Sequence, residues 1–378
     1  MIENNYDILK GINTPSDLKN LNDQEVEKLC AEIREINIDT VSKNGGHLAS
    51  NLGVVELTVA LAQVFDLPED SVIFDVGHQT YPYKLITGRF KDFSTIRTEN
   101  GLSGFPNTAE SKYDLFTTGH SSTSVSSALG ISQANRINED DSYVVSVIGD
   151  GALSGGLAYE GFNNAGRIKR NFIVILNDNT MSISKNVGSV ARHLTHLRTK
   201  PGYIRIKINL ESSLLKIPKI GKHVSNGLRS FKRIIKKFFY KSTIFENFGF
   251  TYYGPIDGHD IHALKKTLES VKLLKRPVLL HVVTSKGKGY QYAEQSPTAY
   301  HGLSGFDINT GDTGKSKKDF SKVFGESICE IAENNNKICV ITAAMSDVTG
   351  LNDFKSKHKD RFFDVGIAEE HAVTFSAG

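Results

Sequence analysis

The stretch VIGDGALSGG places Asp150 between two glycines, directly behind the apolar run YVVSV. A second apolar run, FIVIL, is followed by Asn-Asp-Asn, of which Asn179 is the last residue. Asp150 and Asn179 could each present a side-chain oxygen at neighbouring strand ends, and the backbone carbonyl of Met181 could add a third. Mg²⁺ prefers hard oxygen ligands and is usually held by one or two protein groups together with ligand phosphates. The pattern predicts a magnesium site, where Gly151, Ala152 and the following helix N-terminus offer backbone N–H groups to a diphosphate.

Two other interpretations of the same glycines stay open at this point. A dinucleotide-binding fingerprint needs the pattern G-x-G-x-x-G/A at the start of a helix, with an acid about 20 residues further on. Gly149 and Gly151 fit that pattern, but position 154 is serine and Gly155 comes one place late. The next strand ends farther downstream than the fingerprint requires, where Asp178 stands between two amides. The third interpretation is ordinary turn chemistry at both strand ends, without a ligand.

Apolar runs and helical spacing predict the elements that must position these residues. We expect strands at 142–151, 171–179 and 276–289, a strand followed by a turn within each of 71–77, 337–345 and 361–371, and helices at 26–36, 54–65, 155–168 and 261–274. Strands that alternate with helices predict an α/β fold, a doubly wound parallel sheet with both faces covered. Ligands of such sheets bind beyond the carboxyl ends of the strands. The polar clusters DVGHQ, GDG, NDN and GIAEEH all lie at such ends.

Composition indicates an ordinary globular protein, with 39% hydrophobic and 23% charged residues. The length of 378 residues is enough for about two domains. The three cysteines are scattered and form no CxxC pair, which suits a reducing compartment. The N-terminus lacks the basic and apolar segments of a signal peptide, and no apolar run approaches the ~20 residues that span a bilayer. We therefore expect a cytoplasmic protein.

Positive charge is concentrated in one segment. Residues 198–241 carry 13 Lys/Arg and one acid, whereas the whole chain has a net charge of only +3. Such a stretch could meet nucleic acid, a membrane surface or a phosphorylated ligand. Its apolar residues fall at helical spacing, as in membrane-surface helices, and no nucleic-acid-binding motif accompanies the charge. We favour packing on the protein with attraction of the substrate over membrane contact, and we expect no nucleic-acid partner.

A family resemblance extends from residue 5 to residue 378. The segments GGHLASNLGVVELTVAL, FDVGHQTYPYKLITGR, TTGHSSTSVSSALGIS, GPIDGHD, SKGKGYQYAE and FDVGIAEEHAVTFSAG resemble, in order, those of the 1-deoxy-D-xylulose-5-phosphate synthase family. The resemblance implies a transketolase-like thiamine diphosphate-binding fold with thiamine diphosphate and Mg²⁺ as cofactors. It implies a homodimeric transferase that condenses pyruvate with glyceraldehyde 3-phosphate and releases CO₂. A related transketolase-type enzyme is the alternative.

The resemblance also implies the domain organisation. We expect a diphosphate-binding domain over residues 1–308, with 198–241 as a basic excursion, then a polar linker over 309–319. Residues 320–378 would begin a pyrimidine-binding domain. The family has three domains, so we expect this chain to be a fragment, a truncated product or one half of a split enzyme, with poor activity alone. A non-catalytic chain that binds Mg²⁺ and the diphosphate without turnover is the alternative of a different class.

The resemblance assigns roles to several residues. Those expected to contact the cofactor are His78, Gly119, His120, Ser121 and Tyr290. His47 and His301 resemble histidines that line the substrate channel and serve in catalysis, where imidazoles can move protons or stabilise an oxyanion. Lys286 and Lys288, in SKGKGY, are equally well explained as solvated turn residues.

Glu369, in GIAEEH, matches the family glutamate that bonds N1′ of the aminopyrimidine and so promotes proton removal from the thiazolium. A carboxyl in that role should be buried enough for its pKa to rise. The residues alone leave the choice between Glu369 and Glu370 open, because either could be an acid at a helix N-terminus. The family usually has glutamine at the next position, so Glu370 adds a charge there.

Overall fold

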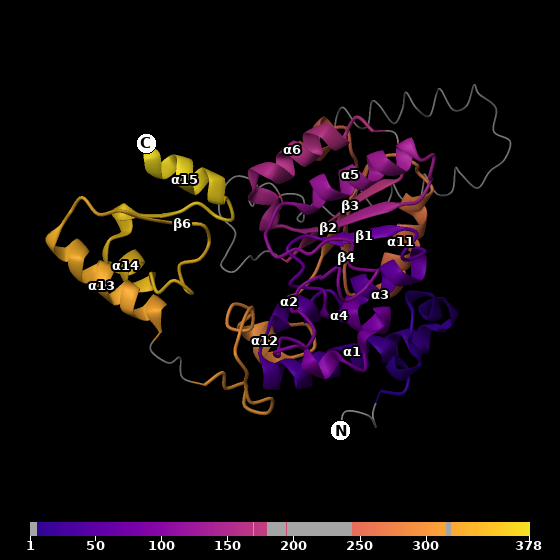
Figure 1. Ribbon diagram of the computed structural model, residues 1–378, viewed down its shortest axis with the longest axis horizontal. Coiled ribbons are helices and arrows are strands. Elements are labelled where there is room, and N and C mark those ends of the chain that lie inside the picture. Colours follow the sequence, from indigo (N-terminus) through magenta and orange to yellow (C-terminus); the bar gives the residue numbers. More distant parts are fainter. Residues whose placement is uncertain (1–5, 169, 180–193, 195–243, 315–318) are drawn as a thin grey trace.

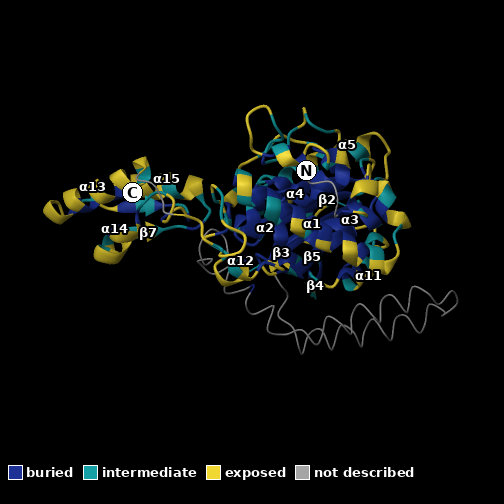
Figure 2. Ribbon diagram, turned by 90° about the horizontal axis from the view of Figure 1, so that it is seen from below, coloured by how far each residue is buried: buried dark blue, intermediate teal, exposed yellow. Residues whose placement is uncertain are grey.

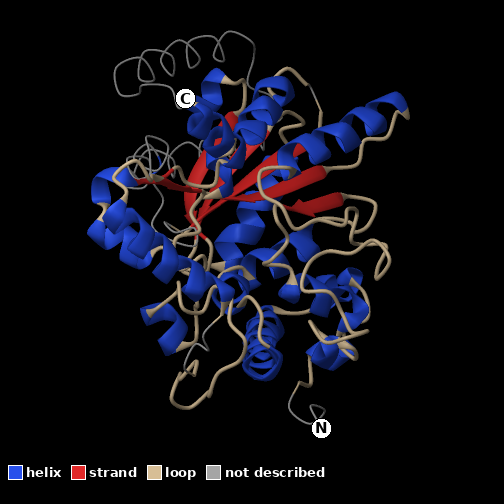
Figure 3. Ribbon diagram, turned by 60° about the vertical axis from the view of Figure 1, so that its left-hand side comes forward, coloured by secondary structure: helices blue, strands red, loops and turns tan. Residues whose placement is uncertain are grey.

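The computed structural model describes residues 6–168, 170–179, 194, 244–314 and 319–378. The predicted ligand Met181 and the basic stretch 198–241 lie outside the described residues. In the larger part of the molecule, a five-stranded parallel sheet lies between layers of helices (Figures 1 and 3). Its order is β1 (Ser71–Phe74), β2 (Val144–Gly149), β3 (Phe172–Asp178), β5 (Val278–Val283) and β4 (Thr251–Asp257). The predicted parallel α/β sheet is confirmed.

Both faces of this sheet are covered, as its continuous apolar strands require. In β2, Val145 and Val147 pack into a core that includes α1 (Asp23–Asn44), α3 (Val55–Val64) and α11 (Ile261–Lys272). Val144 and Ile148 point the other way and pack with α5 (Ser124–Ile137) and α6 (Gly156–Ala165). Because successive side chains of a strand point to opposite faces of the sheet, the apolar residues of β2 contribute to two different cores.

Local signals fix the ends of the helices. At the start of α1, the Asn22 side chain accepts from Glu25 N at 3.1 Å, and the Glu25 side chain accepts from Asn22 N at 2.8 Å. The helix ends at Gly45, which has φ +74°. Shorter helices are α2 (Leu48–Leu52), α4 (Tyr81–Lys84), α10 (Ile244–Asn247) and α12 (Gln291–Gln295). No helix within the described residues is both long and apolar enough to cross a membrane.

Strand β4 was not among the predicted strands, and its sequence explains why. It contains Gly254 and Pro255, residues that usually interrupt a strand. β4 lies at the edge of the sheet, where a proline can be accommodated because one side needs no partner. Gly254 has φ +110°, and a Cβ there would lie 2.3 Å from the carbonyl oxygen of His281 in β5. A glycine is required here because the two strands approach so closely.

Residues 319–378 form a smaller unit around a two-stranded parallel sheet, β6 (Val340–Thr342) and β7 (Phe362–Asp364). Helices α13 (Phe320–Asn334), α14 (Asn352–Lys357) and α15 (Glu369–Ala377) accompany it, and its buried core is small. Figure 2 shows that α13 and α15 are mostly exposed. Phe320, Phe324 and Ile331 on α13 are 95%, 52% and 53% exposed, so this helix presents an uncovered apolar face. The division at 308, 309–319 and 320–378 stays a prediction.

Candidate functional site at the carboxyl edge of the sheet

Three loops leave neighbouring strands at the same edge of the sheet. Asp150 directly follows β2, and its N–H donates to the Asn177 carbonyl at 3.2 Å. Asp178 ends β3, and its carbonyl accepts from Thr284 N, just after β5, at 3.0 Å. Lys286 belongs to that third loop. The parallel register therefore brings together residues that lie more than a hundred positions apart in the sequence.

Asp150, Asp178 and Lys286 form a buried charge cluster. Burial, followed by the negative charge and hydrogen bond of Asp178, raises the pKa of Asp150. The positive charge of Lys286 and the N–H of Asn179 act in the opposite direction. Burial lowers the pKa of Lys286. Two buried carboxyl groups side by side disfavour their shared ionised state, so a divalent cation at this position would relieve their repulsion.

The structure corrects one interpretation of the SKGKGY segment. Lys286 is only 8% exposed and contributes charge to the cluster, so it is not a solvated turn residue. Lys288 is exposed, and its carbonyl accepts from Arg34 Nε at 3.0 Å, as expected of a surface turn. The sequence pattern could not separate these two lysines, because their difference lies in what packs around them.

A buried row of hydrogen-bonded side chains extends from Asp178 of the same cluster. Asp178 Oδ2 lies 2.9 Å from His281 Nε2, and His281 Nδ1 lies 2.7 Å from the Tyr252 hydroxyl oxygen. The three side chains come from β3, β5 and β4 and are all buried. This row of hydrogen-bonded side chains was not predicted from the sequence. The available signal was His281 itself, a polar residue inside the apolar run VLLHVV.

The segment after Asp150 presents the start of a helix. Gly151 leads into a 3₁₀ turn, Ala152–Ser154, and α6 follows from Gly155 with no side chain capping its first turn. The first N–H groups of a helix need partners and favour negative charge. Ala152 is buried and borders this helix start. The arrangement is suited to an anionic ligand such as a diphosphate, as the sequence predicts.

The loop predicted to contact the cofactor lies beside this turn. Gly119 and His120 are exposed and Ser121 is half-buried, so all are accessible to a ligand. The next residue, Ser122, donates its hydroxyl to the carbonyl of Ala152 at 2.8 Å. The structure therefore brings the two predicted diphosphate segments into direct contact.

Three predicted histidines converge. The ring centroids of His47 and His78 lie 5.4 Å apart, those of His47 and His301 5.6 Å, and those of His78 and His301 5.3 Å. Phe105 packs on the His47 ring at 5.5 Å. Among the residues that the structure describes, Nδ1 of His47 and Nδ1 of His78 are buried without a hydrogen-bond partner. Buried nitrogens of this kind normally find a partner, so the cluster is suited to a polar ligand.

The electrostatic surroundings keep these imidazoles neutral. Burial, then the charges of Arg97 and Lys286, lower the pKa of His47 to about 4. Burial, then Lys286 and His47, lower the pKa of His301 to about 3. Burial also holds the pKa of His78 well below its usual value. At neutral pH the three rings can donate or accept a hydrogen bond without carrying charge. Lys286 acts on both the histidines and Asp150, so the two clusters are electrostatically connected.

Asn51 holds two of the histidines in place and was not predicted. Its Nδ2 donates to the carbonyls of His47 at 2.5 Å and His78 at 2.8 Å, and its Oδ1 accepts from Tyr81 N at 2.8 Å. The side chain is fully buried and all these groups are satisfied. A single amide therefore fixes the relation between the start of α2, the turn after β1 and the start of α4. The signal in the sequence was a polar residue inside the apolar stretch LASNLGVV.

Arg97 is another neighbour of the histidines that the sequence did not reveal. Its backbone has φ +62°, unusual for a residue other than glycine, and its N–H donates to the Leu102 carbonyl at 2.7 Å. The positive charge of its side chain opposes the rise that burial causes in the pKa of Tyr81, and the Tyr81 hydroxyl oxygen accepts from His47 N at 3.3 Å. A strained residue at a candidate site is a functional signal that only the backbone shows.

Tyr290 is placed differently from the other predicted cofactor residues. Its hydroxyl donates to the Ile308 carbonyl at 2.9 Å, and its ring packs against Tyr292, Tyr300 and Phe306. These contacts anchor the chain just before the predicted linker. In the described structure Tyr290 therefore has a packing role, and its contact with a cofactor stays a prediction.

Glu369 is exposed at the start of α15, so the burial expected of it is not present in this structure. The segment that precedes it does approach the site. The hydroxyl of Ser154, in the turn after Asp150, donates to the carbonyl of Gly151 at 2.7 Å and shares this hydrogen bond with the carbonyl of Ile367 at 3.1 Å. Glu370 is also exposed, so the structure does not decide between the two acids by burial.

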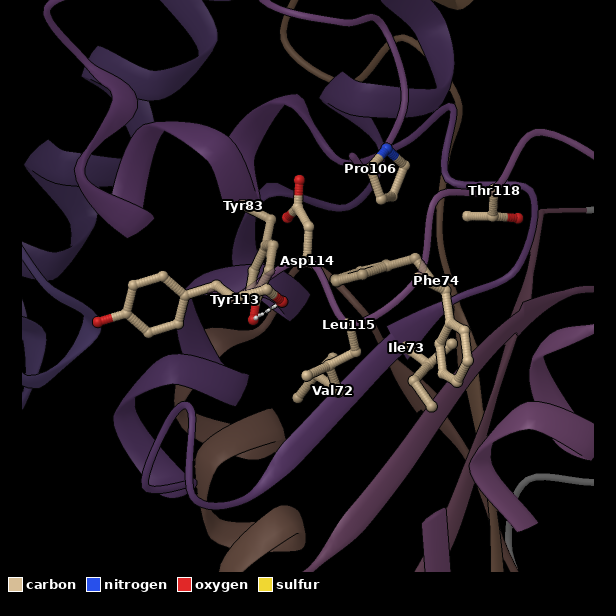
Figure 4. A pocket seen from close by; sticks show the side chains of 10 residues that line it. Val72, Ile73, Phe74, Tyr83, Pro106, Tyr113, Asp114, Leu115 and Thr118 are labelled. Atoms are coloured by element: carbon tan, nitrogen blue, oxygen red, sulfur yellow. Dashed lines mark hydrogen bonds between the residues drawn. The ribbon is translucent and has the colours of Figure 1, made fainter. Parts of the chain in front are cut away.

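A separate hollow lies beside the edge strand β1 (Figure 4). Its lining is mainly apolar and aromatic, and the Tyr83 hydroxyl donates to the Tyr113 carbonyl at 3.5 Å within it. The lining residues are Val72, Ile73, Phe74, Tyr83, Pro106, Tyr113, Asp114, Leu115, Phe116 and Thr118. None of the predicted cofactor or catalytic residues is among them, so this hollow is distinct from the candidate site.

Comparisons with known families agree with the sequence motifs. A family profile described as 1-deoxy-D-xylulose-5-phosphate synthase matches residues 9–284, and one described as transketolase, pyrimidine binding domain, matches residues 316–378. Among curated relatives, a 1-deoxy-D-xylulose-5-phosphate synthase of Alkaliphilus oremlandii is 51% identical over 375 residues, covering 99% of this chain and 60% of that protein. One of Clostridium tetani is 51% identical over 363 residues, covering 96% of this chain and 59% of that protein. The chain thus spans about 60% of the length of these relatives.

Solved structures support the fold. The chain resembles a transketolase from Campylobacter jejuni with a TM-score of 0.54 and 21% identity, over 90% of this chain and 49% of that one. It resembles a transketolase from Leishmania mexicana with a TM-score of 0.52 and 18% identity, over 89% of this chain and 48% of that one. The predicted transketolase-like fold is confirmed.

Proposed function

The chain belongs to the 1-deoxy-D-xylulose-5-phosphate synthase family, and from that premise we propose that it forms the Mg²⁺–thiamine diphosphate-binding part of a transketolase-type carboligase. The reaction would condense pyruvate with glyceraldehyde 3-phosphate and release CO₂. The observation that carries the proposal is the position of the Asp150 cluster and an uncapped helix start beside three neutral histidines. We further propose that the protein acts as a homodimer.

The residues present are suited to the metal. Asp150 and Asn179 would ligate Mg²⁺, with the carbonyl of Met181 as a third ligand. Asp178, buried beside Asp150, adds negative charge to the same place. Mg²⁺ usually takes few protein ligands and completes its coordination with phosphate oxygens.

The diphosphate would bind at the start of α6. The N–H groups of Gly151 and Ala152 would approach it from one side, and the loop Gly119–Ser121 from the other. Lys286 supplies a buried positive charge next to the metal site. His78 would contact the cofactor from the turn after β1. When bound, thiamine diphosphate supplies a thiazolium ring that serves as the electron sink for decarboxylation of a 2-oxo acid.

Other residues of the chain would handle protons and exclude water. Glu369 would hold a proton at N1′ of the aminopyrimidine, and the hydrogen bond between Ser154 and Ile367 keeps its segment near the site. His47 and His301 are neutral at physiological pH, so each can donate a hydrogen bond to a substrate oxygen or accept one from a hydroxyl. Phe105, packed on His47, shields that ring from water.

Cofactor binding without turnover is the second candidate function, and the exposure of Glu369 favours it for this chain alone. A steady-state assay with pyruvate, glyceraldehyde 3-phosphate, Mg²⁺ and thiamine diphosphate separates the two. It is run with and without a separately expressed protein covering the part of the relatives that this chain does not match. Activity that appears only with the added part supports an incomplete site, and full activity of the chain alone contradicts it.

Calorimetry tests the metal assignment. We expect Asp150→Ala to abolish the Mg²⁺-dependent part of thiamine diphosphate binding, because it removes the carboxylate ligand. Asp257→Ala is the matched control, since Asp257 ends strand β4 of the same sheet but is exposed. If the Mg²⁺-dependent affinity for thiamine diphosphate were unchanged in the Asp150 variant, the metal would have to be held elsewhere.

A further inference from the structure

Asp75 lies just beyond β1 and binds the start of α5. Its Oδ1 accepts from Ser122 N at 2.7 Å, and its Oδ2 accepts from Ser124 N at 2.9 Å. The side chain is only 2% exposed. Thr123, which flanks the helix N-terminus, provides no side-chain cap, so the carboxylate from another strand takes over this function.

The residue held by Asp75 has an unusual backbone. Ser122 has φ +70°, in the left-handed region that residues other than glycine seldom adopt. Such a conformation costs free energy and persists only where the surroundings fix it. Here the Asp75 carboxylate holds the Ser122 N–H, and the Ala152 carbonyl holds its hydroxyl at 2.8 Å. Ser122 is therefore the link between the end of β1, the loop before α5 and the turn after Asp150.

We propose that Asp75 is a positioning residue that holds the loop Gly119–Ser121 against the turn Ala152–Ser154, so that both segments face one diphosphate. Asp75 touches neither ligand nor metal in this assignment and acts through Ser122. The inference rests on the proposed function, because it concerns the cofactor that the two segments would bind.

The geometry indicates what a conservative change would do. Asp75→Asn keeps the size of the side chain but replaces one acceptor oxygen by an NH₂ group, which would face a backbone N–H. One charge-assisted hydrogen bond is lost and a buried donor is left without an acceptor. With the NH₂ toward Ser122 N, the strained backbone of Ser122 loses one of its two restraints, and with the NH₂ toward Ser124 N, the start of α5 loses its cap.

The chain offers a closely matched control at the other end of the same strand. Asp70 directly precedes β1 and is 5% exposed. Its Oδ1 accepts from Tyr143 N at 2.7 Å, and its Oδ2 accepts from Asp66 N at 2.9 Å and from Lys272 Nζ at 3.2 Å. Asp70→Asn therefore replaces a buried carboxylate that accepts two backbone hydrogen bonds, as Asp75 does, and also an ion pair, so its loss of stability should be at least as large, far from the carboxyl edge of the sheet.

The experiment compares the 378-residue chain with its Asp75→Asn and Asp70→Asn variants. Urea unfolding measures stability, and calorimetry measures the Kd of thiamine diphosphate with Mg²⁺. Both variants should lose stability, but only Asp75→Asn should raise the Kd, by about 10- to 100-fold, the range seen when a group that orients a metal ligand is lost. A Kd within about threefold of the unchanged chain, or equal to that of Asp70→Asn, would overturn the inference.

A second variant covers the case in which Asp75→Asn does not fold. Ser122→Ala leaves the carboxylate in place and removes the hydroxyl, with its bond to the Ala152 carbonyl and its 3.5 Å contact to the Ser121 hydroxyl. We expect it to fold and to bind thiamine diphosphate at least about fivefold more weakly, and an unchanged Kd would contradict the coupling of the two segments. If the unchanged chain itself failed to bind the cofactor, the proposed function would be wrong. Equal binding by the chain and its variants would instead contradict only the role proposed for Asp75.

Discussion

Lowering the pH from 7 to 5 should destabilise the folded chain by about 4 kcal/mol through His47 and His301. The pKa values of these groups are about 4 and about 3 in the folded chain, against about 6.5 when unfolded. Because the folded pKa is lowered, the unfolded chain takes up the proton first as the pH falls. The stability that these neutral rings allow is fully present above about pH 6.5 and declines below it.

The size of this loss in stability follows from the pH range over which the unfolded chain takes up protons and the folded chain does not. Between pH 6.5 and 5 the unfolded chain gains about 1.4 kcal/mol per pH unit and per histidine, while both folded rings stay neutral. Each histidine thus contributes about 2 kcal/mol to the loss. His47→Asn removes one of these groups, so this variant should lose about 2 kcal/mol less than the unchanged chain over the same pH change.

Urea unfolding at the two pH values measures this difference, with His262→Gln as the control. His262 lies on α11 and its side chain is 53% exposed. The control should lose as much stability as the unchanged chain. If His47→Asn also did so, the His47 ring would have to be hydrated and free to charge in the folded state. That result would refute the neutral histidine cluster and the hydrogen-bonding role proposed for it.

Two further predictions concern packing that supports the site. Lys84 is fully buried and pairs with Glu110 at 2.5 Å and Asp114 at 3.8 Å. Arg89 stays 2.6 Å from Asp114 and 3.7 Å from Glu110, so Lys84→Met mainly removes the nearest cation of Glu110. It should cost about 1–3 kcal/mol in urea unfolding, and an unchanged unfolding midpoint would contradict this. A Cβ on Gly166 would lie 1.4 Å from the Phe248 carbonyl oxygen. Gly166→Ala should therefore lower the free energy of unfolding by at least about 1–3 kcal/mol. An unchanged melting temperature would show that the two segments separate easily.

The central strands could be predicted because they are buried on both faces and therefore read as continuous apolar runs. β2 and β3 were found in this way, within a few residues of their ends. β4 escaped because Gly254 and Pro255 interrupt its pattern, and only its place at the edge of the sheet makes that sequence acceptable. The prediction failed for β4 because the local sequence does not show which strands lie beside it in the sheet.

The same limit applies to the site. Asp150 could be proposed as a ligand because strand ends in a parallel sheet meet at one edge. Lys286, Asn51 and His281 could not, because their importance depends on burial by segments far away in the chain. Glu369 shows the converse case, since a motif predicted its role but could not predict its exposure in this chain.

The strand order of the central sheet also has a kinetic meaning. Ile173 of β3 pairs with Val278 of β5, about 100 residues further along, and Asp150 meets Lys286 only when both strands are in place. Joining segments so far apart requires closure of a large loop, which is a slow step of folding. The Mg²⁺ and diphosphate proposed above would therefore find no site until the sheet is complete. They would slow the unfolding of the finished protein and would not hasten its formation.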